Sequence, residues 1–154
     1  MKQHSQVKPA SSEFENRIAV RWFALGALLA AIGVGLGAFG AHGLENAVQG
    51  KVADPAKSLE YWGTANRYLM YHSFAIMVAA IASLVLGQRK SFSICSCLFV
   101  LGIVLFSGCL YAMALTDFKK LGMIVPFGGL SHIVGWLILS AGLLSASHQG
   151  NKTP

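Results

Sequence analysis

Charged side chains are missing from four long stretches of this 154-residue chain. Residues 22–44, 68–88, 91–116 and 121–151 contain no Asp, Glu, Lys or Arg, and all 18 charged residues lie in the other 53 positions. A helix rises about 1.5 Å per residue, so about 20 residues cross a hydrocarbon core of about 30 Å. The chain is therefore predicted to span a membrane four times, at about 18–41, 65–86, 92–115 and 122–145.

The composition agrees with these spans and limits what else the chain can contain. Hydrophobic residues make up 55% of it, and the mean hydropathy is +0.58. The residues outside the spans are too few to bury a second core, which excludes a soluble catalytic domain. We expect a flexible polar tail over 1–17, a four-span transmembrane domain over 18–146, and a C-terminal tail over 147–154.

Short connections between the later spans determine the expected fold class. Sequential helices joined by short turns pack as antiparallel neighbours, so we expect an all-α protein, an integral membrane antiparallel four-helix bundle. In the longest connection, 42–64, Asp54 is typical of a helix N-cap and Pro55 of a first helical position. The second helix is therefore predicted to begin at this pair, before the membrane.

Basic residues flank the spans rather than forming a stripe, so the net charge of +6 indicates membrane topology and no nucleic-acid partner. With four spans both termini share a side, which holds seven Lys and Arg against five on the other. The seven are Lys2, Lys8, Arg17, Arg21, Arg89, Lys90 and Lys152, and the five are Lys51, Lys57, Arg67, Lys119 and Lys120. The positive-inside rule then predicts a multi-pass protein of the cell inner (plasma) membrane with cytoplasmic termini.

Small residues recur at helical spacing within the spans, where they let helices approach closely. One face of the first span carries glycines every three or four residues, and Gly35, Ala38 and His42 form a second small face. The fourth span repeats glycine every seven residues. The glycines expected at helix contacts are Gly33, Gly37, Gly40, Gly102, Gly128, Gly129, Gly135 and Gly142.

Polar side chains within the spans gather toward the predicted non-cytoplasmic half, and such residues are candidates for function. The candidate cluster comprises His42, Arg67, Tyr71, His72, Ser107 and Tyr111. Imidazole binds metals and titrates near neutral pH, so His42, His72 and His132 are candidates for binding a metal or haem, or for relaying protons. The alternative is that each histidine is hydrogen-bonded to a neighbouring helix.

Motifs of the common enzymes are not found: the sequence has no Walker loop, serine elbow, zinc cluster or dinucleotide fingerprint. The three cysteines read as small packing residues. We therefore expect no enzyme activity, no catalytic residue, no metal and no cofactor.

Four segments carry a family resemblance: 37–44 (GAFGAHGL), 67–72 (RYLMYH), 105–111 (LFSGCLY), and 126–129 (PFGG) with Gly135-Trp136. In order and content they resemble the signature segments of the domain of unknown function 423 family, the transmembrane protein 256-like proteins. The resemblance implies a small bacterial inner-membrane, multi-pass protein with no settled biochemical activity. His42 and His72 fall inside these segments, and His132 falls outside them.

Two hypotheses of function follow. The first is a non-enzymatic membrane protein that acts through helix–helix association with itself, as a homo-oligomer, or with a membrane-protein partner in the lipid bilayer. The alternative is a small-solute or ion path, or a metal- or haem-binding site, in the non-cytoplasmic half of the bundle.

Overall fold

Every regular element of the computed structural model, which describes residues 10–87, 90–116 and 118–150, is a helix. The α-helices are α1 (Ala10–His42), α2 (Leu44–Val48), α3 (Pro55–Leu86), α4 (Lys90–Gly102), α5 (Cys109–Thr116) and α6 (Val125–Gly150). A π-helix, η1 (Ile103–Gly108), joins α4 to α5, and a 3₁₀-helix, η2 (Lys119–Met123), precedes α6.

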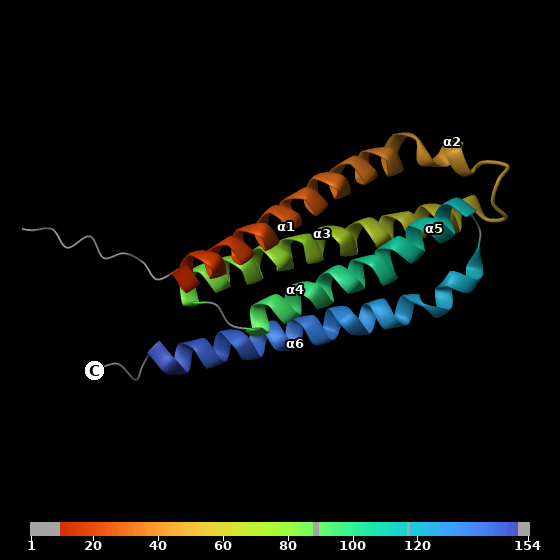
Figure 1. Ribbon diagram of the computed structural model, residues 1–154. Helices are drawn as coiled ribbons and strands as arrows, with labels where there is room; N and C mark the ends of the chain where they lie inside the picture. The colour runs from red at the N-terminus through yellow and green to blue at the C-terminus, as the bar shows by residue number, and fades with distance from the viewer. Residues whose placement is uncertain (1–9, 88–89, 117, 151–154) are drawn as a thin grey trace, which may run out of the picture.

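Four helical segments of the described chain are long and apolar enough to cross a membrane: Asn16–His42, Pro55–Leu86, Lys90–Thr116 and Lys119–His148. They run antiparallel to their neighbours, and the start of α1 lies at the same end as the end of α6 (Figure 1). The predicted all-α antiparallel bundle, with four candidate spans, is thus confirmed.

The four spans are arranged in a row rather than around a closed centre (Figure 1). Helix α1 packs mainly on α3, α3 packs on α4, η1 and α5, and α6 packs mainly on α4 and η1. None of the larger helix contacts in the described chain joins α1 to α6. Consequently α3 and the α4–α5 segment are covered on two sides, while α1 and α6 have one packed side each.

Glycines set the register between α1 and α3. A Cβ atom placed on successive α1 glycines would come within 2.9 Å of an α3 side chain, so no larger residue fits without movement. The facing pairs are Gly26 with Met77, Gly33 with Met70, Gly37 with Asn66, and Gly40 with Trp62. Residue numbers rise along one helix as they fall along the other, as an antiparallel contact requires.

The contact between α6 and the α4–η1 segment follows the same rule. The facing pairs are Gly142 with Ser91, Gly135 with Phe99, Gly102 with His132, and Gly128 with Phe106. Gly129 also faces Phe106, at 3.8 Å from an added Cβ. All eight glycines that the sequence predicted at helix contacts face a neighbouring helix, whereas Gly35 has open space beside it.

The helix boundaries follow local signals in two places. Helix α3 begins at Pro55, and the Asp54 side chain accepts a hydrogen bond from the backbone N–H of Lys57 at 3.0 Å, which confirms the predicted cap. Helix α1 begins at Ala10, within the segment expected to be a tail, and α6 continues to Gly150. The outer parts of the predicted tails, 1–9 and 151–154, lie outside the described residues.

Candidate functional site

Two histidines from distant parts of the chain stack face to face inside the bundle. His72 of α3 and His132 of α6 have ring centroids 3.3 Å apart and ring planes within 9° of parallel. Their side chains are buried, at 4% and 3% exposure. Burial of two stacked imidazoles disfavours charge on both rings, because like charges at this distance repel strongly outside water.

Hydrogen bonds define the state of His72. Its Nδ1 lies 2.7 Å from the carbonyl oxygen of Tyr68, which can only accept, so Nδ1 carries the proton. The indole N–H of Trp136 donates to Nε2 of His72 at 3.3 Å, so Nε2 carries the lone pair. Both nitrogens are engaged, and the geometry assigns a neutral imidazole.

His132 has no such partners. Among the described residues, neither of its ring nitrogens has a hydrogen bond, although both are buried. One edge of the ring, including Nδ1, lies against Gly102, and a face of the ring covers His72. A buried polar group without a hydrogen-bond partner costs about 1–3 kcal/mol and is rare in folded proteins. The unpaired nitrogens of His132 therefore indicate a position where a ligand could bind.

A pocket of about 390 Å³ opens beside the stacked pair. It lies between α3, η1 and α6, and its lining comprises Tyr68, Tyr71, His72, Phe106, Gly129, His132, Ile133 and Trp136. Three of these residues are well exposed although they lie within spans: Tyr71 at 56%, Ile133 at 59% and Trp136 at 45%. The mouth of the pocket therefore faces the lipid side of the bundle.

The π-helix forms one wall of this pocket. It carries Phe106, whose ring centroid is 4.5 Å from that of Tyr68 and 6.1 Å from that of His132. It also carries Ser107, whose hydroxyl is buried without a partner among the described residues. A π-helical turn inside an α-helix is rare and is frequently found at functional sites.

The residues of the predicted polar cluster occupy several places. Tyr71 and His72 line the pocket, and Ser107 is buried in its π-helical wall. His42 is exposed at the end of α1, and Arg67 is exposed and donates to the hydroxyl of Thr64 at 3.1 Å. The structure therefore brings part of the cluster together and leaves His42 and Arg67 at the surface.

Tyr111 belongs to a second polar group, nearer the end of the bundle that holds α2. Its hydroxyl donates to Asn66 Oδ1 at 2.9 Å, and its ring meets Trp62 edge-on with centroids 4.5 Å apart. The Trp62 indole donates to the backbone carbonyl of Leu36 at 2.9 Å. These bonds connect α1, α3 and α5 and satisfy their donors, so this group stabilises the fold.

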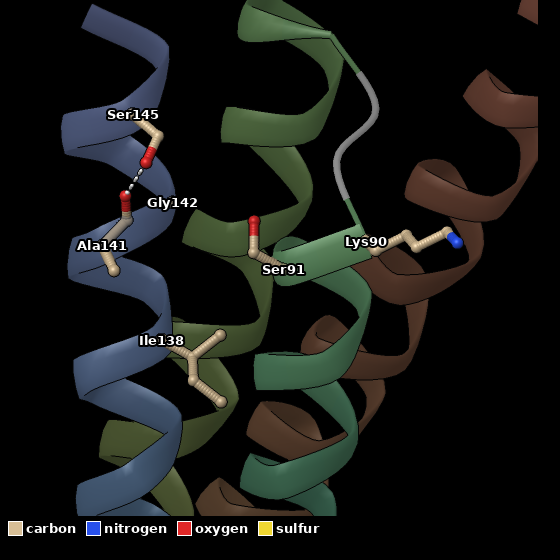
Figure 2. A pocket seen from close by; sticks show the side chains of 6 residues that line it. All are labelled: Lys90, Ser91, Ile138, Ala141, Gly142 and Ser145. Carbon is tan, nitrogen blue, oxygen red and sulfur yellow. Dashed lines mark hydrogen bonds between the residues drawn. The ribbon is translucent and has the colours of Figure 1, made fainter. Parts of the chain in front are cut away.

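Another pocket, of about 350 Å³, lies at the opposite end of the bundle between the start of α4 and the end of α6 (Figure 2). The Ser145 hydroxyl is bonded to the carbonyl of Ala141 on its own helix at 2.8 Å, and Lys90 points away from Ser91. This pocket contains no convergent set of polar groups, so it is a weaker candidate. No group of three or more His, Cys, Asp or Glu side chains in the described chain is arranged to hold a metal.

Four ring residues of the pocket lie outside the predicted polar cluster: Tyr68, Phe106, Trp136, and His132, which the sequence indicates only as a separate candidate ligand. A signal was present, because Tyr68 and His72, and likewise His132 and Trp136, are four residues apart and share a helix face. Two such pairs of ring residues in two spans indicate a common ring-lined site, provided that the two spans are neighbours.

Comparison with known proteins gives a family but no activity. The family described as "Protein of unknown function (DUF423)" matches residues 36–129. The UPF0382 membrane protein YwdK of Bacillus subtilis is 44% identical over 75% of this chain and 89% of its own length. The UPF0382 membrane protein SSP2132 of Staphylococcus saprophyticus is 44% identical over 77% of this chain and 92% of its own. No solved structure matches.

Proposed function

Because the chain belongs to the DUF423 family of membrane proteins of unknown function, its activity has to be argued from its own site, and we propose that it binds a small lipid-soluble molecule. The binding site is the pocket between α3, η1 and α6. One observation carries this proposal: His132 lines the pocket, is 3% exposed, and has neither ring nitrogen bonded within the described chain. A ligand with polar atoms would remove that cost.

The proposed role is binding without catalysis. His72 has both nitrogens in hydrogen bonds, so it would have to break one before it could take up a proton. His132 is stacked on His72, where a positive charge is disfavoured by burial. The site thus offers shape and hydrogen bonding to a ligand rather than a base for proton transfer.

We further propose that the protein lies in the cell inner (plasma) membrane with cytoplasmic termini. The larger number of Lys and Arg residues on the side of the termini supports this orientation. The stacked histidines then lie near the middle of the spans, toward the non-cytoplasmic half. Labelling of single cysteines introduced at Gly50 and at Ser147 with a membrane-impermeant reagent tests this: label in intact cells is expected at residue 50 alone.

A pocket-filling substitution tests the proposed function. Ile133→Trp places a large ring at the mouth of the pocket, and Leu137→Trp, one turn further along α6 and outside the pocket lining, is the matched control. Each protein is extracted in a mild detergent, and small molecules that accompany it are identified by mass spectrometry. We expect a stoichiometric molecule with the wild type and the control and none with Ile133→Trp. Equal amounts with all three proteins would contradict the proposal.

A second role, association with another copy, is favoured by the outer face of α1. Gly35 has no atom within 4 Å of an added Cβ, and Ala38 and His42 beside it are exposed. Small residues on a lipid-facing helix allow a second backbone to approach closely. Crosslinking in native membranes is expected to give a dimer that Gly35→Leu abolishes, and a dimer unaffected by that change would exclude this face.

A further inference from the structure

The chemistry of the pocket narrows the class of its ligand. Resting on the proposed function, we infer that the ligand is a lipid-soluble quinone: a neutral, planar ring with carbonyl oxygens and an apolar tail. Four features of the lining support this class, namely its entrance, its flat walls, its lack of charge and its unpaired donor.

The entrance selects molecules that are dissolved in the bilayer. Tyr71, Ile133 and Trp136 form an exposed rim, and all three lie inside segments that cross the membrane. A water-soluble ligand would have to leave water before reaching this rim, at a large cost for every polar group. A molecule with a long apolar tail reaches it by lateral diffusion and can leave the tail among the lipid chains.

Three of the rings that line the pocket, those of Tyr68, His72 and His132, lie in similar orientations, whereas Trp136 crosses His72 at 57° and Phe106 crosses His132 at 66°. The plane of Tyr68 lies 26° from that of His72 and 35° from that of His132, and the two imidazoles are within 9° of each other. Planar groups stack on aromatic faces with a gain beyond the area that they bury. A flat six-membered ring gains from these walls, whereas a flexible acyl chain gains only from burial.

The polarity of the lining selects a neutral ligand that accepts hydrogen bonds. Its eight residues are aromatic, aliphatic, glycine or histidine, so no carboxylate, ammonium or guanidinium is present to pair with an ionic group. Neutral His132 carries one N–H, which has no acceptor among the described residues. A quinone carbonyl supplies that acceptor, while a hydrocarbon would leave the N–H unpaired.

Access to His132 requires one wall to move, and the π-helix provides the side chain that moves. The nitrogens of His132 are buried, and the half-buried ring of Phe106 lies 6.1 Å from the imidazole at the edge of the pocket. Binding requires Phe106 to rotate toward the lipid, which would open the side of His132 away from Gly102, since the Nδ1 edge of the ring lies against Gly102. The ligand ring then takes the place that Phe106 leaves beside Tyr68.

The chain contains its own reporter for this binding. Of its three tryptophans, Trp136 lines the pocket, whereas Trp22 lies on α1 and Trp62 lies between α1 and α3. Quinones quench indole fluorescence at short range. Protein in phosphatidylcholine nanodiscs is titrated with a benzoquinone bearing a ten-carbon tail and, in parallel, with decylbenzene, which has the same tail and no carbonyl.

We expect saturable quenching by the quinone alone. Trp22→Phe retains the saturable component and Trp136→Phe loses it, which locates the quinone in the pocket. His132→Leu, which removes both nitrogens, weakens binding about tenfold, the value of one hydrogen bond at the upper end of its usual range. Phe106→Ala removes the ring that has to move and is expected to tighten quinone binding. Because a misfolded protein would not bind more tightly, this variant tests the inference even if His132→Leu fails to fold.

Failure of this inference is distinguishable from failure of the proposed function. The quinone assignment is wrong if the quenching by the quinone does not saturate. It is also wrong if decylbenzene competes for the pocket as effectively as the quinone does. If Ile133→Trp still excludes an accompanying molecule of another class, the proposed function stands with a different ligand. Both proposals are wrong if no quinone binds and if Ile133→Trp does not reduce the amount of any accompanying molecule.

Discussion

The close contact between α6 and the π-helix gives a prediction whose size follows from the structure. A Cβ atom on Gly128 would lie 2.5 Å from the backbone nitrogen of Phe106 and 2.9 Å from the carbonyl carbon of Leu105. Carbon atoms in contact are separated by about 3.5–4.0 Å, so Gly128→Ala forces the two backbones apart by about 1 Å. Overpacking of this kind costs about 1–3 kcal/mol, and a backbone neighbour cannot turn aside as a side chain can.

Gly35 provides the matched control. It also lies inside a helix in a span, but an added Cβ meets nothing within 4 Å. Replacing glycine by alanine in a helix gains about 1 kcal/mol of intrinsic propensity, and this gain is common to both variants. The difference in unfolding free energy between the two variants therefore measures the packing cost at Gly128 alone. We expect Gly128→Ala to be less stable than Gly35→Ala by about 1–3 kcal/mol.

Equilibrium unfolding in mixed micelles, with sodium dodecyl sulfate as denaturant and circular dichroism as the signal, measures both values. Ligand-free, monomeric protein is used for all samples, because a bound molecule, or a second copy on the face that contains Gly35, would add its own stabilisation. A Gly128→Ala protein as stable as Gly35→Ala would refute the reasoning, since it would mean that α6 does not approach η1 as closely as described.

Three further changes test single hydrogen bonds by the same unfolding measurement. Tyr111→Phe removes the donor to Asn66 and is expected to cost about 1 kcal/mol; an unchanged midpoint would contradict that bond. Trp62→Phe removes the donor to the Leu36 carbonyl and should cost at least as much, because it also reduces ring contact with Tyr111. Asp54→Ala removes the α3 cap at a cost of about 1 kcal/mol, whereas Asp54→Asn should retain most of the stability.

Features that depend on neighbouring residues in the chain could be predicted from the sequence. The absence of charge determines the spans, and the Asp54-Pro55 pair determines where α3 begins. The spacing of Gly33, Gly37 and Gly40 determines which face of α1 packs, because three or four residues make one helical turn. Each of these signals lies within one helix.

Features that depend on which helices meet could not be predicted in this way. His72 and His132 are 60 positions apart in spans that are not consecutive, and only the placement of α6 beside η1 and α3 brings them together. His42 shares a small face with Gly35, but that face is uncovered because α1 has one neighbouring span, so His42 is exposed.

The row arrangement of the four spans has a consequence for assembly. The spans form two helical hairpins, α1 with α3 and the α4–α5 segment with α6, and each hairpin has its own register of glycine contacts. Each can therefore close as its second helix enters the membrane, before the two hairpins dock. The pocket lies on the docking seam, since α3 contributes Tyr68, Tyr71 and His72 and the other hairpin contributes the rest. A molecule held there binds only the docked state, and it would hold the two halves of the protein together.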